Sequence, residues 1–216
     1  LDLAKGGVGL VITGYAFVCK EEKPNPGMLG AYDDSFIDDF QKLAETAHDH
    51  KCKIALQIVY GGTQCTCGKK EEEKMNLLGA SAVYNPHTQL TPKRATKEDI
   101  KELIKSFGRA ALRAKKSGMD GVQIHAAHGY LLSQWLSPYF NKRTDEYGGK
   151  PEKRARIIYE VYEEIRRQVG EKYPVMIKLN CDDFMGEQGI TKKDTIPIAV
   201  KLDRLGIDAI EVSGGN

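Results

Sequence analysis

The chain has 216 residues, of which 41% are hydrophobic and 29% are charged, and its formal net charge is +2. That length suits one large domain or two small ones, and the composition is ordinary for a globular protein with a hydrophobic core. The nearly balanced charge gives no reason to expect nucleic acid or a membrane surface as a partner, and no apolar run approaches the ~20 residues of a membrane span.

Five short apolar runs, rich in Val and Ile, predict strands that are buried on both faces, as in a parallel sheet. In chain order they are GLVIT (9–13), KIALQIVY (53–60), DGVQIH (120–125), VMIKLN (175–180) and DAIEVS (208–213).

Two long amphipathic segments lie between these runs and have readable ends. Thr96 followed by Asp99 predicts a capping box at a helix start, and Gly118 ends that helix. Pro151 suits the first turn of a second helix, which we expect to continue to Gly170.

A third helix is predicted after residue 190, where Thr191 and Asp194 repeat the capping signature. Pro197 lies close behind them and has no backbone N–H to donate. We therefore expect an irregular or kinked start to this helix.

One local pattern recurs three times, in GGVGLVIT, SGMDGVQIH and LGIDAIEVS, each passing from a helix through glycine into a strand. Repeated β-α units imply an α/β fold with a parallel sheet. At about 40 residues per unit the closed TIM (β/α)8 barrel is favoured over an open doubly wound sheet. No glycine-rich dinucleotide fingerprint follows a predicted strand, which weakens the open-sheet alternative further.

The number of strands is smaller than a closed barrel needs, because a barrel has eight strands and typically ~250 residues. We therefore predict one partial barrel domain over residues 1–216, made of about five β-α units. It would lack about one strand at its start and two at its end, and we expect exposed sheet edges.

The five cysteines are Cys19, Cys52, Cys65, Cys67 and Cys181. Their odd number and their spacing match neither a disulfide framework nor a paired metal site. We interpret them as thiols of a reducing compartment and expect a cytoplasmic protein without a cysteine-bound metal.

Two histidines and a tyrosine follow the third predicted strand closely. His125 ends the strand, and His128 and Tyr130 stand in the loop just beyond it. In a parallel barrel the carboxyl ends of the strands form the active site, so these side chains should converge there. Imidazole N–H groups can polarise a carbonyl oxygen, and a phenol can act as a general acid.

Two other interpretations of the histidine pair remain open. The H-x-x-H spacing can arise by chance, with both rings hydrogen-bonded inside the loop. It can also hold zinc, as in a metal-dependent hydrolase, with Cys181, Asp182 or Asp183 as the third ligand.

The stretch DGVQIHAAHGYLLSQWLSPYFNKRTDEYGG (120–149) resembles the signature of the old yellow enzyme family, the FMN-dependent NAD(P)H:flavin oxidoreductases and ene-reductases. Trp135 stands where the family usually has Phe. GVGLVITG, LQIVYGG, PVMIKLN and GIDAIEVSGG fall in the order of the family's second, third, fifth and sixth barrel strands. VITGY and IKLNCDDF look most like the bacterial enoate and 2,4-dienoyl-CoA reductases and bile-acid flavoproteins.

The resemblance implies a reaction and roles for three residues. FMN would be reduced by NADH or NADPH and would then pass hydride from its N5 to an activated alkene, an α,β-unsaturated carbonyl compound. His125 and His128 would bind the carbonyl oxygen of this small-molecule substrate. Tyr130 would protonate the α-carbon.

The resemblance also implies a flavin site. Gln57 matches the glutamine that bonds the pyrimidine edge, and Lys178 stands where the family often has an Arg near N1. Gly14 or Tyr15 matches the segment that packs near the flavin ring. Without the resemblance, Gln57 reads as a buried amide and Lys178 as a strand-end cation in water. Residues 143–149 are interpreted as loop architecture.

Some features depart from the family and leave questions open. Tyr60 stands where many members have His, so the substrate is not fixed. The strands that we expect to be missing include those whose loops hold the FMN phosphate, which keeps an inactive fragment as an alternative. An iron–sulfur cluster would lie outside this chain, and a homo-oligomer remains open.

Overall fold

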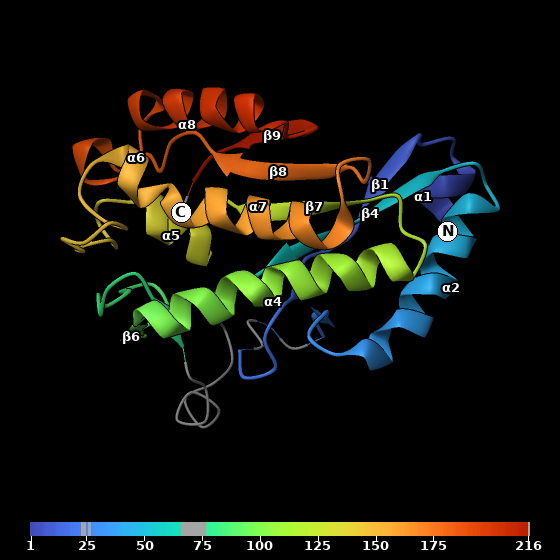
Figure 1. Cartoon of the computed structure of the whole chain (residues 1–216), viewed down its shortest axis with the longest axis horizontal. Coiled ribbons are helices and arrows are strands. Elements are labelled where there is room, and N and C mark those ends of the chain that lie inside the picture. The colour runs from blue at the N-terminus through green and yellow to red at the C-terminus, as the bar shows by residue number, and fades with distance from the viewer. Residues whose placement is uncertain (23–24, 26, 66–76, 216) are drawn as a thin grey trace.

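The computed structural model describes residues 1–22, 25, 27–65 and 77–215, and a parallel sheet forms its centre (Figure 1). The strand order is β3-β2-β4-β7-β8-β9, and β1 also pairs with β4. Every pairing in this sheet is parallel. The strands are β1 (Leu10–Ile12), β2 (Ala16–Phe17), β3 (Leu29–Gly30), β4 (Lys53–Val59), β7 (Gly121–Ala126), β8 (Val175–Asn180) and β9 (Ala209–Ser213).

Helices follow the strands and cover the sheet. Figure 1 shows α4 and α7 side by side, with α8 beyond α7. The helices are α1 (Asp2–Lys5), α2 (Ile37–His48), α4 (Lys97–Lys116), α5 (Leu131–Leu136), α6 (Pro151–Arg154), α7 (Arg156–Val169) and α8 (Lys192–Leu205). Short elements complete the set: the 3₁₀ turns η1 (Asp34–Phe36) and η2 (Gly186–Gln188), and a separate pair, β5 (Leu78–Gly79) with β6 (Lys93–Arg94).

All five predicted strands are present, and the first is followed by a short strand, β2, that was not predicted. β1 pairs with the first half of β4 and β2 with its second half, so residues 10–17 follow one edge of β4 with a break between them. At the break the Thr13 hydroxyl accepts the backbone N–H of Gln57 at 3.2 Å, where a regular strand would offer a carbonyl. This irregularity releases Tyr15 from the strand at the carboxyl end of the sheet.

The predicted turn between helix and strand is confirmed, and a fourth copy was missed. The three glycines have positive φ, of 85° at Gly7, 80° at Gly118 and 90° at Gly206. Lys51 takes the same role before β4 with φ of 58°, and the Cys52 N–H donates to the Ala47 carbonyl at 3.1 Å, as in a Schellman motif. A lysine in this conformation is uncommon, so the sequence pattern did not reveal it.

The capping boxes at Thr96 and Thr191 are both confirmed. Two details of the helices were wrong. The helix expected from Pro151 is divided at Ala155, where the Ile158 N–H reaches back three residues to the Ala155 carbonyl, which tightens the turn. α8 runs without interruption through Pro197, because one lost N–H is tolerated while Ile198 packs into the core.

The two faces of the sheet differ in chemistry. Alternate strand residues such as Leu56, Ile58, Val122, Ile124 and Ile177 are fully buried and pack in the core with the helices. The positions between them carry a row of polar side chains on the opposite face. In the part of the chain that the structure describes, no helix is long and apolar enough to cross a membrane.

Candidate active site at the carboxyl ends of the strands

A cavity of about 430 Å³ lies at the carboxyl ends of β4, β7 and β8. Its described lining is Tyr15, Asn25, Gln57, Gln64, His125, His128, Tyr130 and Lys178. Six of the seven predicted site residues are therefore brought together here. Gly14, the seventh, is not among the described lining residues.

The polar face of the sheet forms the floor of this cavity. The strand register places Gln57 beside Gln123, His125 beside Lys178, and Lys178 beside Glu211. The Gln57 amide donates to Gln123 at 2.6 Å, and the Gln123 amide donates to Glu211 at 2.9 Å. Lys178 is thus no cation in open water: its Nζ lies 2.8 Å from a Glu211 oxygen and its side chain is 20% exposed.

His125 is neutral and its tautomer is defined. The Ala127 N–H donates to His125 Nδ1 at 3.3 Å, so Nδ1 is an acceptor and the ring proton lies on Nε2. Burial, followed by the charges of His128 and Lys178, lowers the pKa of His125 to about 3. The ring therefore offers a neutral N–H donor throughout the neutral pH range.

His128 stands on a sharp turn just after β7, with φ of 56°. Its ring packs edge-on against His125, with centroids 5.2 Å apart. Its Nε2 lies 2.6 Å from the Ser213 hydroxyl at the end of β9. Burial and the Lys178 charge lower the pKa of His128, and Glu211 opposes this shift.

Tyr130 immediately precedes α5 and faces His125 and a second phenol. Its ring centroid lies 4.8 Å from that of His125 and 5.2 Å from that of Tyr15. Burial raises the pKa of Tyr130, as does its hydrogen bond with Tyr15, while a bond from Asn25 acts in the opposite direction. The phenol is consequently protonated at neutral pH, as a general acid must be.

The loop after the site has the structural role that the sequence indicated. Arg143 makes a two-pronged ion pair with Asp145, at 3.0 and 2.6 Å. The Tyr147 hydroxyl donates to Glu160 at 2.8 Å. A Cβ on Gly148 would lie 2.1 Å from the Arg143 carbonyl oxygen, so only glycine fits there.

The ligand set that a zinc site would need is not assembled around the histidine pair in residues 1–22, 25, 27–65 and 77–215. His128 bonds Ser213, and Asp183 accepts from the Asn180 amide and the Ile190 N–H. Among these described residues, no three His, Cys, Asp or Glu side chains gather as metal ligands would. Cys67 lies outside the described residues.

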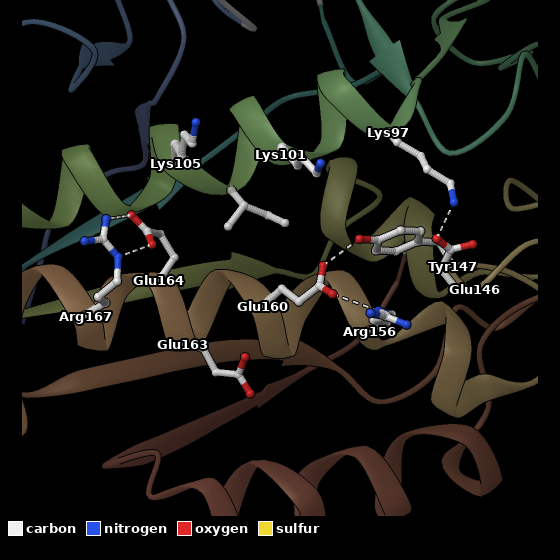
Figure 2. A pocket seen from close by; sticks show the side chains of 11 residues that line it. Lys97, Lys101, Lys105, Glu146, Tyr147, Arg156, Glu160, Glu163, Glu164 and Arg167 are labelled. Atoms are coloured by element: carbon white, nitrogen blue, oxygen red, sulfur yellow. Dashed lines mark hydrogen bonds and ion pairs between the residues drawn. The ribbon is translucent and has the colours of Figure 1, made fainter.

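A larger cavity, of about 640 Å³, lies on the outer side of the helices between α4 and α7 (Figure 2). Figure 2 shows that ion pairs border it, with Lys97 bonded to Glu146 at 2.8 Å and Arg156 to Glu160 at 2.7 Å. None of the predicted site residues is among its described lining. The groove is bordered mainly by charges that already have partners, so the strand-end cavity is the better candidate for chemistry.

Comparison with known proteins gives one consistent result. The sequence profile of a family described as NADH:flavin oxidoreductase / NADH oxidase matches residues 2–216. An NADPH dehydrogenase of Geobacillus sp. (strain WCH70) is 36% identical over 212 residues, which are 98% of this chain and 60% of that protein. An NADH oxidase of Thermoanaerobacter brockii is 37% identical over 213 residues, 98% of this chain and 32% of that protein.

Solved structures agree with the sequence comparison. A 2-naphthoyl-CoA reductase in complex with 2-naphthoyl-CoA superposes with a TM-score of 0.91 at 30% identity, covering 99% of this chain and 34% of that one. Old yellow enzyme from Pichia sp. AKU4542 gives a TM-score of 0.85 at 25% identity, covering 97% and 60%. These overlaps confirm the predicted partial TIM barrel.

Proposed function

Because the chain belongs to the NADH:flavin oxidoreductase / NADH oxidase family, which includes old yellow enzyme, we propose that it reduces an activated alkene with electrons from NADH or NADPH. The substrate class is a small α,β-unsaturated carbonyl compound. Since the chain spans 60% of the length of the Geobacillus relative, the activity is proposed for the whole protein.

The observation that supports this proposal most is the meeting of two imidazoles and a phenol in one cavity. Addition of hydride to the β-carbon of an enone builds negative charge on the carbonyl oxygen. The neutral N–H of His125, with His128 beside it, would stabilise that oxygen. Tyr130, protonated and in contact with His125, would hold the proton that the α-carbon receives.

The residues present fit a flavin. Gln57 offers an amide and Lys178 a cation on the floor of the same cavity, which matches the polar edge and the electron-rich N1 region of the ring. Tyr15 would lie against the ring system. When bound, FMN supplies the hydride, and the side chains of this chain orient the substrate and move the proton.

The predicted location and partners remain part of the proposal. Among the described residues, Cys19, Cys52 and Cys181 form no disulfide, which supports a cytoplasmic protein. We propose a small-molecule partner in place of nucleic acid or a membrane.

The proposal is tested by a visible absorption spectrum of the whole protein with FMN, followed by anaerobic NADH and then 2-cyclohexenone. We expect a perturbed flavin band that NADH bleaches and the enone restores. A flavin that is reduced by NADH but reoxidised by oxygen alone would contradict the alkene substrate. No bound flavin would contradict the cofactor site.

A matched pair of variants makes the test specific for the site. His125→Ala should slow reoxidation by the enone by about 10²–10³-fold, the effect of removing one donor to a developing oxyanion. His50→Ala, at an exposed position, should leave that rate unchanged.

A further inference from the structure

A second, smaller cavity of about 180 Å³ shares a lining residue, Gln64, with the strand-end cavity. The rest of its described lining is Asn85, Pro86, His87, Tyr139, Phe140 and Met185. We call this space the side pocket. The alkene reduction proposed above gives no role to any of these six residues.

The side pocket is formed by three segments, and each of them follows a strand of the cavity floor. Residues 85–87 lie between β4 and α4, Tyr139 and Phe140 follow β7 and α5, and Met185 follows β8. In a barrel of this kind the substrate is bound by the loops at the carboxyl ends of the strands. The side pocket therefore lies where a more distant part of the same substrate molecule can be bound.

The walls of the side pocket are held by contacts within the protein. The Asn85 amide donates to the Thr63 hydroxyl at 3.1 Å, and the Asn85 side-chain oxygen accepts the His87 N–H at 3.0 Å. Phe140 is buried, and its ring packs edge-on against Tyr139 with the centroids 4.9 Å apart. Because these groups already have partners, the pocket is preorganised for a ligand.

The chemistry of the lining favours an uncharged aromatic ligand. Among the described lining residues there is no carboxylate, ammonium or guanidinium group that could pair with a charged ligand. The rings of Tyr139 and Phe140 and the thioether of Met185 instead make favourable contacts with an aromatic ring. The volume suits one six-membered ring, since an apolar cavity of about 150 Å³ can hold benzene.

Resting on the proposed alkene reduction, we propose that the side pocket binds an aromatic ring carried on the β-carbon of the substrate. In that reaction the histidine pair holds the carbonyl oxygen, so the opposite end of the conjugated system is the end that extends past Gln64. The substrate class thereby narrows to aryl-substituted α,β-unsaturated carbonyl compounds. Tyr139 and Met185 are residues that determine this specificity.

Two ketones that differ in one group test this inference on the flavin-loaded whole protein. Benzylideneacetone carries a phenyl group where ethylideneacetone carries a methyl group. Tyr139→Ala removes an aromatic wall of the side pocket. We therefore expect kcat/KM for the phenyl ketone to fall about tenfold and kcat/KM for the methyl ketone to change by less than about two-fold. Each ketone is compared with itself, so the difference in their intrinsic reactivity cancels.

Tyr84→Ala is the matched control for this substitution. Tyr84 is 51% exposed and is not among the described lining residues of either cavity. The change from tyrosine to alanine is the same, but it lies outside the side pocket. Tyr84→Ala should therefore leave kcat/KM for both ketones unchanged.

A second measurement uses the wild-type protein and needs no turnover. The methyl NMR resonance of isotopically labelled Met185, identified by its loss in Met185→Leu, reports on the side pocket. Benzylacetone has no alkene to reduce, and we expect its ring to shift this resonance, while methyl propyl ketone at the same concentration leaves it unchanged. Absence of this phenyl-specific shift would overturn the inference. A larger shift with adenosine would also overturn it, because the pocket would then belong to the base of the nicotinamide cofactor.

The outcomes separate the side pocket from the function on which it rests. Reduction of both ketones, with Tyr139→Ala slowing them equally, would overturn the side pocket alone. If the wild-type protein reduces neither ketone and does not reduce 2-cyclohexenone, the proposed function fails, and the side pocket with it.

Discussion

Lys178 and Glu211 form an ion pair across two neighbouring strands on the floor of the cavity, with Nζ and Oε1 2.8 Å apart. The same carboxylate accepts the Gln123 amide, which in turn accepts from Gln57. Burial acts to raise the pKa of Glu211, but the bonds from Lys178 and Gln123 outweigh it and lower that pKa. The site therefore contains a cation whose charge is partly cancelled.

This pairing predicts the flavin potential. Glu211→Gln leaves the Lys178 charge uncompensated, and that charge favours the anionic reduced flavin. The two-electron reduction potential of the flavin should therefore rise by about 30 mV, which corresponds to a tenfold change in the equilibrium constant for its reduction. Spectroelectrochemical titration of the flavin-loaded protein measures it. Glu187→Gln removes an exposed carboxylate and is the control. A fall in potential would contradict the expected role of Lys178.

The lowered pKa of His125 predicts how stability changes with pH. Its folded pKa of about 3 lies below the ordinary value of about 6.5, so the unfolded chain binds a proton first as the pH falls. Between about pH 7 and pH 5 the wild type should lose roughly 1–2 kcal/mol more unfolding free energy than His125→Asn. Urea unfolding of both proteins at the two pH values provides the comparison. Equal losses of unfolding free energy in the two proteins would show that His125 is protonated as readily in the folded state as in the unfolded state.

The contact between Ser213 and His128 predicts that the serine hydroxyl orients the His128 ring. The Ser213 hydroxyl lies 2.6 Å from His128 Nε2, so Ser213→Ala removes the partner that orients this ring. By analogy with groups that orient metal-binding histidines, we expect about a tenfold loss in kcat/KM for the enone. Ser213→Thr keeps the hydroxyl and should retain most of the activity. An equally inactive Thr variant would point to crowding in the cavity.

At the opposite end of the sheet, we expect the Asp120 carboxylate to stabilise the folded protein. It accepts bonds from the Ile54 N–H at 2.9 Å, from His48 at 2.7 Å and from Lys53 at 2.8 Å. Although burial acts to raise the pKa of Asp120, these bonds lower it. Asp120→Asn should therefore cost roughly 1–3 kcal/mol at pH 7.

The pH dependence of that loss has a defined sign. The contribution of Asp120 is fully present above its unfolded pKa of about 3.9, and it disappears as the pH falls through the lower folded value. Chemical unfolding at pH 7 and near pH 3 measures this. Asp49→Asn, at an exposed position, should change stability little at either pH.

The backbone conformation of Lys51 predicts that replacing this residue with glycine stabilises the folded protein. The φ of 58° at Lys51 is the conformation that glycine occupies in the equivalent turns. Lys51→Gly relieves the left-handed strain, and after the entropic cost of glycine a gain of about 0.5–1 kcal/mol is expected. Gly118→Ala should lose about 1–2 kcal/mol, although a Cβ there meets nothing within 4 Å. Thermal unfolding of both variants decides, and a destabilised Lys51→Gly would contradict the strain.

The sequence predicted best those features that rest on local patterns. Strand positions and helix caps depend on neighbouring residues, and the motif around His125 and Tyr130 is continuous in the chain. Asn25 and Gln64 were missed because they reach the cavity from irregular loops, where spacing gives no signal. The helix α2 was also missed.

Glu211 could have been found. Glu211 and Ser213 are two residues apart on a predicted strand, so they lie on the same face. A charged residue on a strand that is buried on both faces needs a partner. That Lys178 is the partner of Glu211 depends on the register between β8 and β9, which no local sequence pattern determines. The roles of Gln57, Lys178 and Tyr15 at the flavin stay predictions.

β9 is an edge strand of the sheet and, among the described residues, pairs with β8 alone. It nevertheless supplies Glu211 to Lys178 and Ser213 to His128. A strand with one neighbour frays more readily than a central one, so these two contacts are the first that local opening would remove. The stability of β9 therefore affects the geometry of the site, and hydrogen exchange along β9 should report how firmly Glu211 and Ser213 are held beside Lys178 and His128.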